Sequence, residues 1–555
     1  MPIITISKQE VKKFLGNLKD EEIDYKLNMA ELGVERMGED EIDIEITPNR
    51  PDLLSIQGLK RYLENYFKKP RRGEYKVEKP EKDYKVIIDK SVKKVRPYTV
   101  CAIVKGLKFD DEKIKEIIDI QEKLHSGYGR NRKKLAIGIY PLEAIKLPIK
   151  FLGRKPEDIK FQPLEFSREI NGRQILSQHP TGREYGDLLK DCEFFPVFED
   201  ANKEILSMPP IINSEKTGKV SYETHDIFIE CSGFNLEYLK KTLNMIVCAL
   251  ADMGGKIYAM EIDDKTQGKS LSPDLESEKI KFSINSLNKL LGLDLNEKEI
   301  KKYLEKMGVG FEKNEEECFA LIPCYRTDIL HEVDLVEEVA IAYGFDKLEP
   351  EIPQISTIGK EDKSAVFKRK ISDVLVGLGL LEVSSYHLST KEKQFKKIGI
   401  KEFKNKMIEV MDSKTENNIL RDSLLAQLIE VFSENSDASY PQKIFELGRV
   451  FYNDDFKNSE TGVGEEERLG IGLCHEKANF TELKQILDYL MRMLNVEYEI
   501  MESSHPSFID GRCGSVIVND KEIGVIGEIA PFVLKNNKIK MPVGVMEIGV
   551  GELVS

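Results

Sequence analysis

Apolar and polar residues alternate in short runs along this chain, between longer stretches that have helical spacing. Residues 3–15 are typical of a strand followed by a helix that Ser7 caps. Residues 41–46 alternate acidic and apolar positions, as a half-buried strand does. A helix over 53–67 and a charged segment containing prolines follow, and the latter predicts a linker. We therefore predict a small α/β domain with its linker over residues 1–90.

A second region with strand-like runs begins at about residue 100. Its later part is rich in Pro, Ser, Thr and Asn between short strands, and an amphipathic helix closes it at the double glycine 254–255. These patterns predict a second domain over residues 91–268.

Two further domains follow. In the third, predicted over 275–352, Asn296 and Glu299 form a cap pair at a helix start, and a later helix runs from about Ile329 to Tyr343. The last, over 360–555, mixes helices with strands and contains a hairpin that turns at Asn519-Asp520.

Composition narrows the class of protein. The 555 residues are 41% hydrophobic and 32% charged, which is typical of a globular protein. No apolar run approaches the ~20 residues that span a bilayer, and the N-terminus lacks a signal-peptide pattern. We therefore expect a cytoplasmic protein with no membrane contact. Because the net charge is −14, any RNA contact must use local basic patches or a partner.

Eight cysteines are present, and none forms a CxxC pair. This spacing favours reduced, mostly buried thiols over disulfides or a structural zinc site.

An acidic cluster marks the helix predicted over 329–343. At ~100° per residue, Asp334, Glu337 and Glu338 lie opposite the apolar face, and Asp328 stands at the helix start. The residues alone leave two interpretations open. The cluster is either a solvated acidic face or a site where a hard divalent cation relieves the repulsion between carboxylates.

Several segments, in order, resemble the β chain of phenylalanyl-tRNA synthetase in its archaeal and eukaryotic form. They are ITPNRPDLLSIQGLKRYL, GREYGDLLKDCEFFPVFED, ILSMPPIINS, FIECSG, residues 323–343, NILRDSLLAQLIEVFSEN, KIFELGRVF and IGVIGEIAP. The resemblance implies an α+β multidomain protein. Its parts would be the small N-terminal α/β domain, a B3/B4-type editing domain, a small helical or winged B5-type domain that binds metal, and a class II synthetase-like antiparallel-sheet domain without an active site.

The resemblance also implies partners and a cofactor. The chain would form an (αβ)₂ heterotetramer with an α subunit that binds ATP, phenylalanine and, together with this chain, tRNA. Matched residue by residue, the family's Mg²⁺ ligands, shared with the α subunit, fall on Asp328, Asp334, Glu337 and Glu338.

A proofreading site is expected because phenylalanine and tyrosine differ by one hydroxyl, which an apolar pocket rejects by only ~100-fold. Glu230 and Ser232 are two residues apart, so on a strand they share one face. By resemblance, the editing pocket is lined by Phe198, Ser207, Glu230 and Ser232. No Ser/His/Asp or Cys/His set is evident beside them, so we expect hydrolysis by a positioned water.

The last domain contains a segment that imitates a synthetase motif, Gly462 to Arg468. Three consecutive glutamates in it would repel ATP phosphates, and we predict that it is a loop before the strand 469–474.

The densest basic cluster is the turn 129–134, where Arg130, Arg132, Lys133 and Lys134 are candidate RNA contacts, although a solvated turn is the alternative. KKPRR at 68–72 is interpreted as linker.

Two other functions stay open for the whole chain: a free-standing editing hydrolase, and a non-catalytic RNA-binding scaffold.

Overall fold

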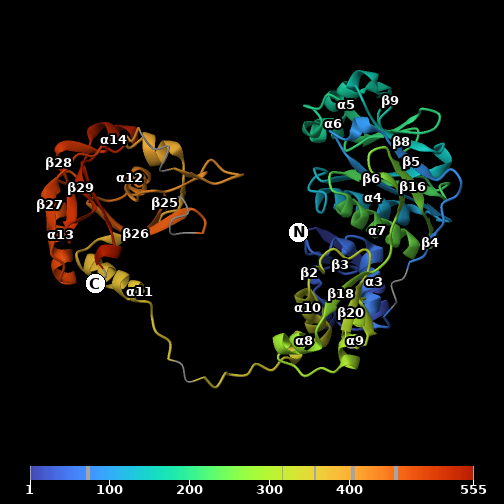
Figure 1. Ribbon diagram of the computed structural model, residues 1–555, viewed down its shortest axis with the longest axis horizontal. Coiled ribbons are helices and arrows are strands. Elements are labelled where there is room, and N and C mark those ends of the chain that lie inside the picture. The colour runs from blue at the N-terminus through green and yellow to red at the C-terminus, as the bar shows by residue number, and fades with distance from the viewer. Residues whose placement is uncertain are drawn as a thin grey trace. The chain divides into compact units, whose positions relative to one another are not determined.

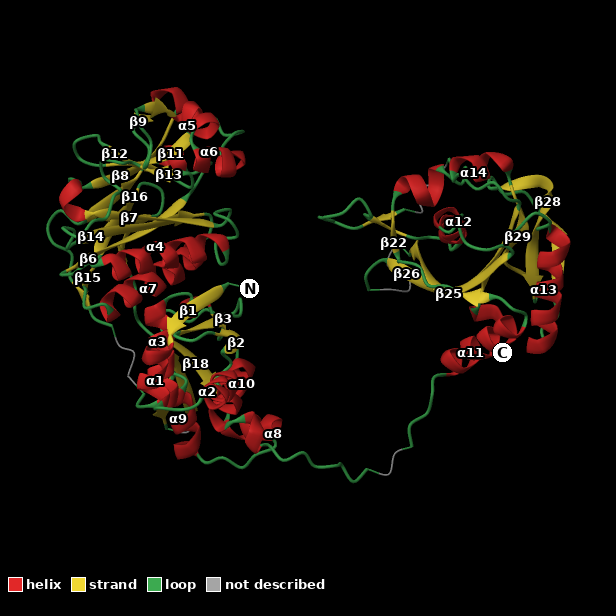
Figure 2. Cartoon of the chain, turned by 180° about the vertical axis from the view of Figure 1, so that it is seen from behind, coloured by secondary structure: helices red, strands yellow, loops and turns green. Residues whose placement is uncertain are grey.

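The computed structural model separates into two compact units, Met1–Ile352 and Pro353–Ser555, drawn in Figures 1 and 2. It describes residues 2–70, 75–315, 317–355, 358–401, 407–454 and 460–553. The predicted linker KKPRR at 68–72 therefore lies partly outside the described residues. Within the described residues, no helix combines the length and apolar character that crossing a bilayer requires.

The chain begins with a three-stranded sheet of order β1-β3-β2 and three helices. As predicted, Ser7 caps the first helix: its Oγ accepts a hydrogen bond from the Glu10 amide at 3.2 Å. The third helix begins at Ile56 rather than at residue 53, because Pro51–Leu53 form a separate 3₁₀ turn. The elements are β1 (Ile3–Ser7), α1 (Lys8–Leu15), α2 (Asp20–Met29), β2 (Gly33–Met37), β3 (Glu41–Glu45) and α3 (Ile56–Phe67).

A five-stranded sheet follows, in the order β4-β15-β6-β14-β7, and α4 and α7 cover one of its faces (Figure 2). Alternate residues of its strands, such as Ile137 on β7 and Ile229 on β14, pack toward these helices in one hydrophobic cluster. The elements are β4 (Val77–Glu78), β6 (Tyr98–Lys105), α4 (Asp111–Ser126), β7 (Leu135–Pro141), β14 (Ile227–Gly233), α7 (Leu236–Asp252) and β15 (Lys256–Tyr258).

The opposite face of that sheet packs on a seven-stranded sheet of order β13-β12-β11-β8-β5-β16-β17. Cys101, Tyr140 and Phe228 from the first sheet join Phe151 and Phe198 from the second in one buried cluster. The elements are β5 (Lys85–Ile88), β8 (Ile149–Arg154), β11 (Phe195–Glu199), β12 (Ile205–Met208), β13 (Ile212–Asn213), β16 (Met260–Asp264) and β17 (Gly268–Ser272), with β9 (Lys160–Phe161), β10 (Ile170–Asn171), α5 (Gly172–Gln178) and α6 (Pro180–Tyr185) beside them.

The first unit ends in a three-stranded sheet, β18-β20-β19, with three helices. The predicted capping pair is confirmed: Asn296 and Glu299 each accept from the other's backbone amide. The last helix begins at Glu332, not at Ile329, and Val333 in its first turn is 56% exposed. The elements are β18 (Glu278–Phe282), α8 (Ile284–Leu291), α9 (Glu297–Lys306), β19 (Gly310–Asn314), β20 (Glu317–Ile322) and α10 (Glu332–Tyr343).

The second unit is built on a seven-stranded sheet of order β21-β25-β26-β30-β29-β28-β27, antiparallel except at the β21–β25 pair. The predicted hairpin at Asn519-Asp520 is present between β28 and β29, and both residues have positive φ. The elements are α11 (Lys363–Gly377), β21 (Leu381–Glu382), β22 (Leu388–Ser389), β23 (Ile408–Glu409), β24 (Ile419–Leu420), α12 (Leu425–Glu434), β25 (Gln442–Asn453), β26 (Val463–Cys474), α13 (Phe480–Leu494), β27 (Glu499–Glu502), β28 (Phe508–Val518), β29 (Lys521–Ile529), α14 (Pro531–Asn536) and β30 (Val543–Gly549).

The prediction of a loop over 462–468 is wrong. Residues 463–468 belong to β26 and pair with residues 448–453 of β25. Strand alternation sends Glu465 and Glu467 to one face, where Arg449 binds both. The glutamate run is therefore compatible with a strand, because Arg449 pairs with Glu465 and Glu467 while Arg468 pairs with Glu466.

Candidate functional site

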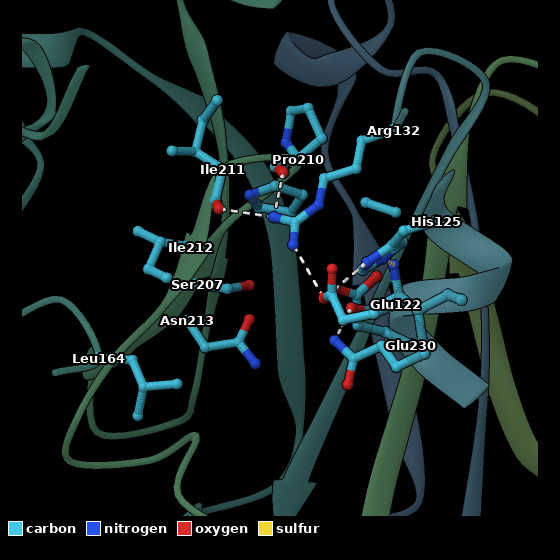
Figure 3. Close-up of a pocket in the computed structure, with 14 residues that line it drawn as sticks. Glu122, His125, Arg132, Leu164, Ser207, Pro210, Ile211, Ile212, Asn213 and Glu230 are labelled. Carbon is cyan, nitrogen blue, oxygen red and sulfur yellow. Dashed lines mark hydrogen bonds and ion pairs between the residues drawn. The ribbon is translucent and has the colours of Figure 1, made fainter. Parts of the chain in front are cut away.

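A cavity of about 110 Å³ lies between the five-stranded and the seven-stranded sheet of the first unit (Figure 3). Ser207 reaches it from β12 and Glu230 from β14, so the structure brings these two predicted editing residues together. Both side chains are almost completely buried. The polar groups around the cavity come from Glu122, His125, Arg132, Ser207, Asn213 and Glu230.

Tyr140 at the end of β7 joins Ser207 to Glu230. Its hydroxyl lies 2.7 Å from Ser207 Oγ and 3.3 Å from Glu230 Oε1, and it is 3.5 Å from Asn213 Oδ1. The ring is fully buried and stacks on Phe228. The sequence patterns did not single out Tyr140, since it ends an ordinary apolar strand.

Gly138 makes this arrangement possible. It lies opposite Glu230 in the β7–β14 register, and a Cβ there would stand 2.2 Å from the Tyr140 hydroxyl and 2.6 Å from Glu230 Oε1. A side chain would therefore occupy the space into which both polar groups extend. An isolated glycine inside a strand is the one sequence signal that could have pointed to this close approach.

Burial governs the electrostatics of Glu230. Removal from water raises its pKa from 4.5 to about 8, although the guanidinium of Arg96 and the hydrogen bonds of Ser232 and Tyr140 act in the opposite direction. Its Oε2 atom is buried and has no hydrogen-bond partner among the described residues. An unpaired buried oxygen costs free energy, so it favours a ligand that supplies a partner.

The other two predicted residues lie close by but do not line the cavity. Ser232 is one pleat beyond Glu230 on β14, and its Oγ accepts a hydrogen bond at 3.1 Å from Arg96, which also donates to the Ser232 carbonyl at 2.7 Å. Phe198 pairs with Ser207 across β11 and β12 and stacks on Phe151, with ring centroids 4.3 Å apart. Ser232 therefore positions Arg96, and Phe198 supports the wall behind Ser207.

His125 reaches the cavity, but its ring nitrogens are already engaged. Nε2 accepts the Ile137 amide at 2.8 Å, so Nδ1 carries the proton toward Glu122 Oε1, 3.3 Å away. Burial lowers the pKa of His125 and favours the neutral ring. With Nε2 occupied, His125 cannot take a proton from Ser207, so the described lining holds no serine–histidine pair suited to nucleophilic attack.

The predicted basic turn divides into two groups. Arg132 points inward: it donates to the carbonyls of Pro210 and Ile211 at 3.2 and 2.9 Å and to Glu122 at 3.0 Å (Figure 3). Arg132 thus bridges two walls of the cavity instead of facing solvent.

Arg130 and Lys133 are the exposed members of the turn. Lys134 is partly buried, and its Nζ lies 4.7 Å from the ring centroid of Tyr238. Two of the four candidate RNA contacts are therefore free to meet a phosphate without rearrangement.

The four predicted metal ligands lie at the start and along the side of α10. Asp328 and Glu338 both bind Arg326, whose Nη2 donates to each at 2.7 Å. Asp334 accepts from the amides of Leu330 and His331, both at 2.7 Å. Helical periodicity placed Glu338 on the solvent side, but it is buried because Arg326 neutralises it there.

Glu337 is exposed on α10, and Glu31 from the N-terminal domain joins the cluster. Burial, followed by the charges of Glu337 and Glu338, raises the pKa of Glu31. Carboxylate oxygens suit Mg²⁺, but in the described part of the chain no three acidic, histidine or cysteine side chains converge in a geometry that could hold a metal. The carboxylate oxygens suit Mg²⁺, but their present positions do not form a site that would hold it.

The second unit has a larger hollow of about 960 Å³ on its sheet. Arg468 lies in it, held by Glu466 at 2.9 Å and by buried Glu547 at 3.1 Å. Asp422, Glu522 and Glu552 also line this hollow. A guanidinium fixed between two carboxylates is a poor receptor for a nucleotide phosphate.

Two protein families match the chain. Residues 280–345 match the tRNA synthetase B5 domain, and residues 348–550 match the phenylalanyl tRNA synthetase beta chain CLM domain. A solved N-terminal fragment of the phenylalanyl-tRNA synthetase β-subunit from Pyrococcus horikoshii is 36% identical, with a TM-score of 0.58. It covers 62% of this chain and 99% of its own.

Full-length relatives extend the likeness over the whole chain. The phenylalanine–tRNA ligase beta subunit of Pyrococcus abyssi is 39% identical over 99% of both chains. That of Archaeoglobus fulgidus is 36% identical over 99% of this chain and 98% of its own. With this identity sustained across both units, the chain belongs to the family of phenylalanine–tRNA ligase β subunits.

Proposed function

We propose that this chain, with an α subunit, attaches phenylalanine to its tRNA using ATP, and that it hydrolyses mischarged tyrosyl-tRNA at the cavity between its five-stranded and first seven-stranded sheets. The observation that supports the editing role is the buried pair Ser207 and Glu230 on one cavity, with Glu230 Oε2 unpartnered among the described residues. A phenol hydroxyl both donates and accepts hydrogen bonds, so it suits a carboxyl group beside a serine hydroxyl.

The role assigned to this cavity is to recognise the side chain of the attached amino acid. Because His125 is held by the Ile137 amide, the bond cleavage falls to a water positioned at the rim. The side chain of the bound amino acid would fix the ester relative to that water, and a side chain without a hydroxyl would leave Glu230 unpaired.

Entry of a tyrosyl ring requires the cavity to widen. Its volume is about 110 Å³, and an apolar cavity of roughly 150 Å³ holds a benzene ring. Arg132 is the side chain that ties the Pro210–Ile211 wall to Glu122 on α4. We infer that release of one of these contacts accompanies binding.

Activation of phenylalanine is assigned to the α subunit in an (αβ)₂ assembly in the cytoplasm. Support comes from the second unit, where Glu466 and Glu547 hold Arg468 and further carboxylates surround it. This chain alone is then expected neither to activate phenylalanine nor to charge tRNA. Turnover by rigorously purified chain would contradict this assignment.

Magnesium at the α10 carboxylates is also part of the proposal. Asp328, Asp334, Glu337 and Glu338 supply oxygen donors, and the bound ion would neutralise a carboxylate cluster shared with the α subunit. Since Arg326 already engages Asp328 and Glu338, the partner must supply ligands or displace that arginine.

The editing role is tested with Glu230→Ala in the assembled enzyme, by following release of tyrosine from tyrosyl-tRNA. A fall in the rate of at least about tenfold is expected, because the ligand hydroxyl loses a buried hydrogen-bond partner. Glu223→Ala, an exposed glutamate of the same domain, is the matched control. If tyrosyl-tRNA is cleared as fast by the Glu230 variant as by the control, the editing proposal is rejected.

A further inference from the structure

The hydroxyl of Tyr140 has a single proton and two buried neighbours. Ser207 Oγ is 2.7 Å away and Glu230 Oε1 is 3.3 Å away, and all three side chains are at most 1% exposed. A tyrosine hydroxyl donates one hydrogen bond and accepts others. Both contacts can therefore be hydrogen bonds at once only if one neighbour donates to Tyr140.

The surroundings of Glu230 decide the direction of the chain of hydrogen bonds. Glu230 is buried, its Oε2 has no hydrogen-bond partner among the described residues, and the guanidinium of Arg96 donates to Ser232. These surroundings favour the neutral carboxylic acid, which has a proton to donate to Tyr140, and Tyr140 then donates to Ser207. Burial supports this state by raising the Glu230 pKa to about 8. The ionisable groups that interact with it are Arg96, which opposes the shift, and Cys101, Cys231 and Tyr140, whose own pKa values are raised.

We propose that Tyr140 is a positioning residue that sets the polarity of the cavity: by accepting from Glu230 and donating to Ser207, it leaves the Ser207 proton and Glu230 Oε2 to face a ligand hydroxyl. The cavity then presents one donor and one acceptor, the complement of a phenol. The inference rests on the proposed function only for the identity of that ligand.

The two directions of hydrogen bonding make opposite predictions for the Glu230 pKa. If Glu230 donates to Tyr140, then Tyr140→Phe removes the acceptor that stabilises the neutral acid, and the pKa falls. In Ser207→Ala, Tyr140 loses its own acceptor and turns its proton to Glu230, so the pKa also falls. If Tyr140 instead donates to an ionised Glu230, the first substitution raises the pKa and the second leaves it unchanged.

The test is a pH titration of the full chain by infrared difference spectroscopy of the protonated carboxyl band, assigned by its loss in Glu230→Gln. Tyr84→Phe is the matched control, because Tyr84 belongs to the same buried cluster and its hydroxyl interacts with Lys105 and Glu81 instead of Ser207 and Glu230. We expect lower midpoints in Tyr140→Phe and Ser207→Ala and an unchanged midpoint in Tyr84→Phe. A raised or unchanged midpoint in Tyr140→Phe overturns the inference.

Specificity gives a second readout in the assembled enzyme. Non-hydrolysable 3′-amide analogues carrying tyrosyl or phenylalanyl adenosine are compared by calorimetry. The wild-type enzyme should prefer the tyrosyl analogue by about 10–100-fold, and Tyr140→Phe should lose most of that preference while Tyr84→Phe keeps it. Full retention in Tyr140→Phe overturns the inference. If the wild-type enzyme fails to hydrolyse tyrosyl-tRNA while the infrared shifts occur, the proposed editing function fails and the Tyr140 arrangement stands.

Discussion

Arg326 donates to both carboxylate oxygens of Glu338 on α10, at 2.7 and 3.1 Å, and both side chains are buried. The same guanidinium holds Asp328. This arginine occupies the position that a cation would take between the two carboxylates. The Arg326 guanidinium and a metal ion would therefore compete for the position between Asp328 and Glu338, and this competition can be measured.

Replacing Arg326 with Met should expose that competition. The substitution leaves Asp328 and Glu338 buried without the counter-charge of that arginine, which costs roughly 3–5 kcal/mol of unfolding free energy. Millimolar Mg²⁺ should then raise the melting temperature of the variant, because a ligand that binds only the folded state stabilises it. Thermal unfolding with and without Mg²⁺ measures the effect.

The matched control for that experiment is Arg449→Met. Arg449 pairs with Glu465 and Glu467 on β26 and is about half exposed, so its carboxylates remain hydrated. No Mg²⁺ response is expected there. Equal stabilisation of both variants, or of neither, would count against a cation site at Asp328 and Glu338.

Gly138→Ala should disable the cavity while leaving the sheet in place. The new methyl would lie 2.2 Å from the Tyr140 hydroxyl and 2.6 Å from Glu230 Oε1, and such overpacking costs about 1–3 kcal/mol. Hydrolysis of tyrosyl-tRNA by the assembled enzyme should fall at least about tenfold as these groups are displaced. The matched control is Gly33→Ala in strand β2, where a Cβ would meet nothing within 4 Å. It should change neither stability nor hydrolysis by a comparable amount.

The sequence predicts much of the local structure because caps, turns and alternation are local. Ser7, Asn296 and Asn519-Asp520 behave as expected for this reason. Strand alternation likewise places Glu230 and Ser232 on one face of β14. The family assignment from eight short segments is confirmed by full-length relatives.

Interactions between residues distant in sequence escape that reasoning. Tyr140 and Ser207 are 67 residues apart and meet only because two sheets pack face to face. Helical periodicity predicts an exposed Glu338 because it cannot detect Arg326, which precedes it by 12 residues in a loop. The charge run groups Arg132 with its basic neighbours because it does not reveal that one member turns inward.

The basic turn yields a prediction that separates its members. Arg130→Gln and Lys133→Gln should each lower the slope of log affinity for tRNA against log salt by about 0.7–0.9 for each phosphate that is no longer neutralised. Arg132→Gln should leave the slope unchanged, since its guanidinium binds Pro210, Ile211 and Glu122. Filter binding of tRNA over a range of salt concentrations measures the slope for each variant. A slope change confined to Arg132→Gln would mean that the turn rearranges on binding RNA.

The pH dependence of stability follows from Glu230. Its pKa is about 8 in the folded chain and 4.5 is its ordinary value, so between these limits the folded state binds more protons than the unfolded state. Stability from the buried neutral acid is thus complete below about pH 4.5, declines as pH rises toward 8, and is level above it. The total decline is about 4–5 kcal/mol, from 1.36 kcal/mol per pKa unit.

Glu230→Gln isolates this contribution, because a glutamine does not titrate while every other group is retained. Denaturant unfolding of the first unit at a series of pH values should show wild-type stability falling relative to the variant between about pH 5 and pH 8. Parallel pH profiles would mean that Glu230 is ionised in the folded chain, and a wild-type advantage growing with pH would mean that Arg96 stabilises its carboxylate. Either result would also remove the neutral acid on which the hydrogen-bond arrangement at Tyr140 depends.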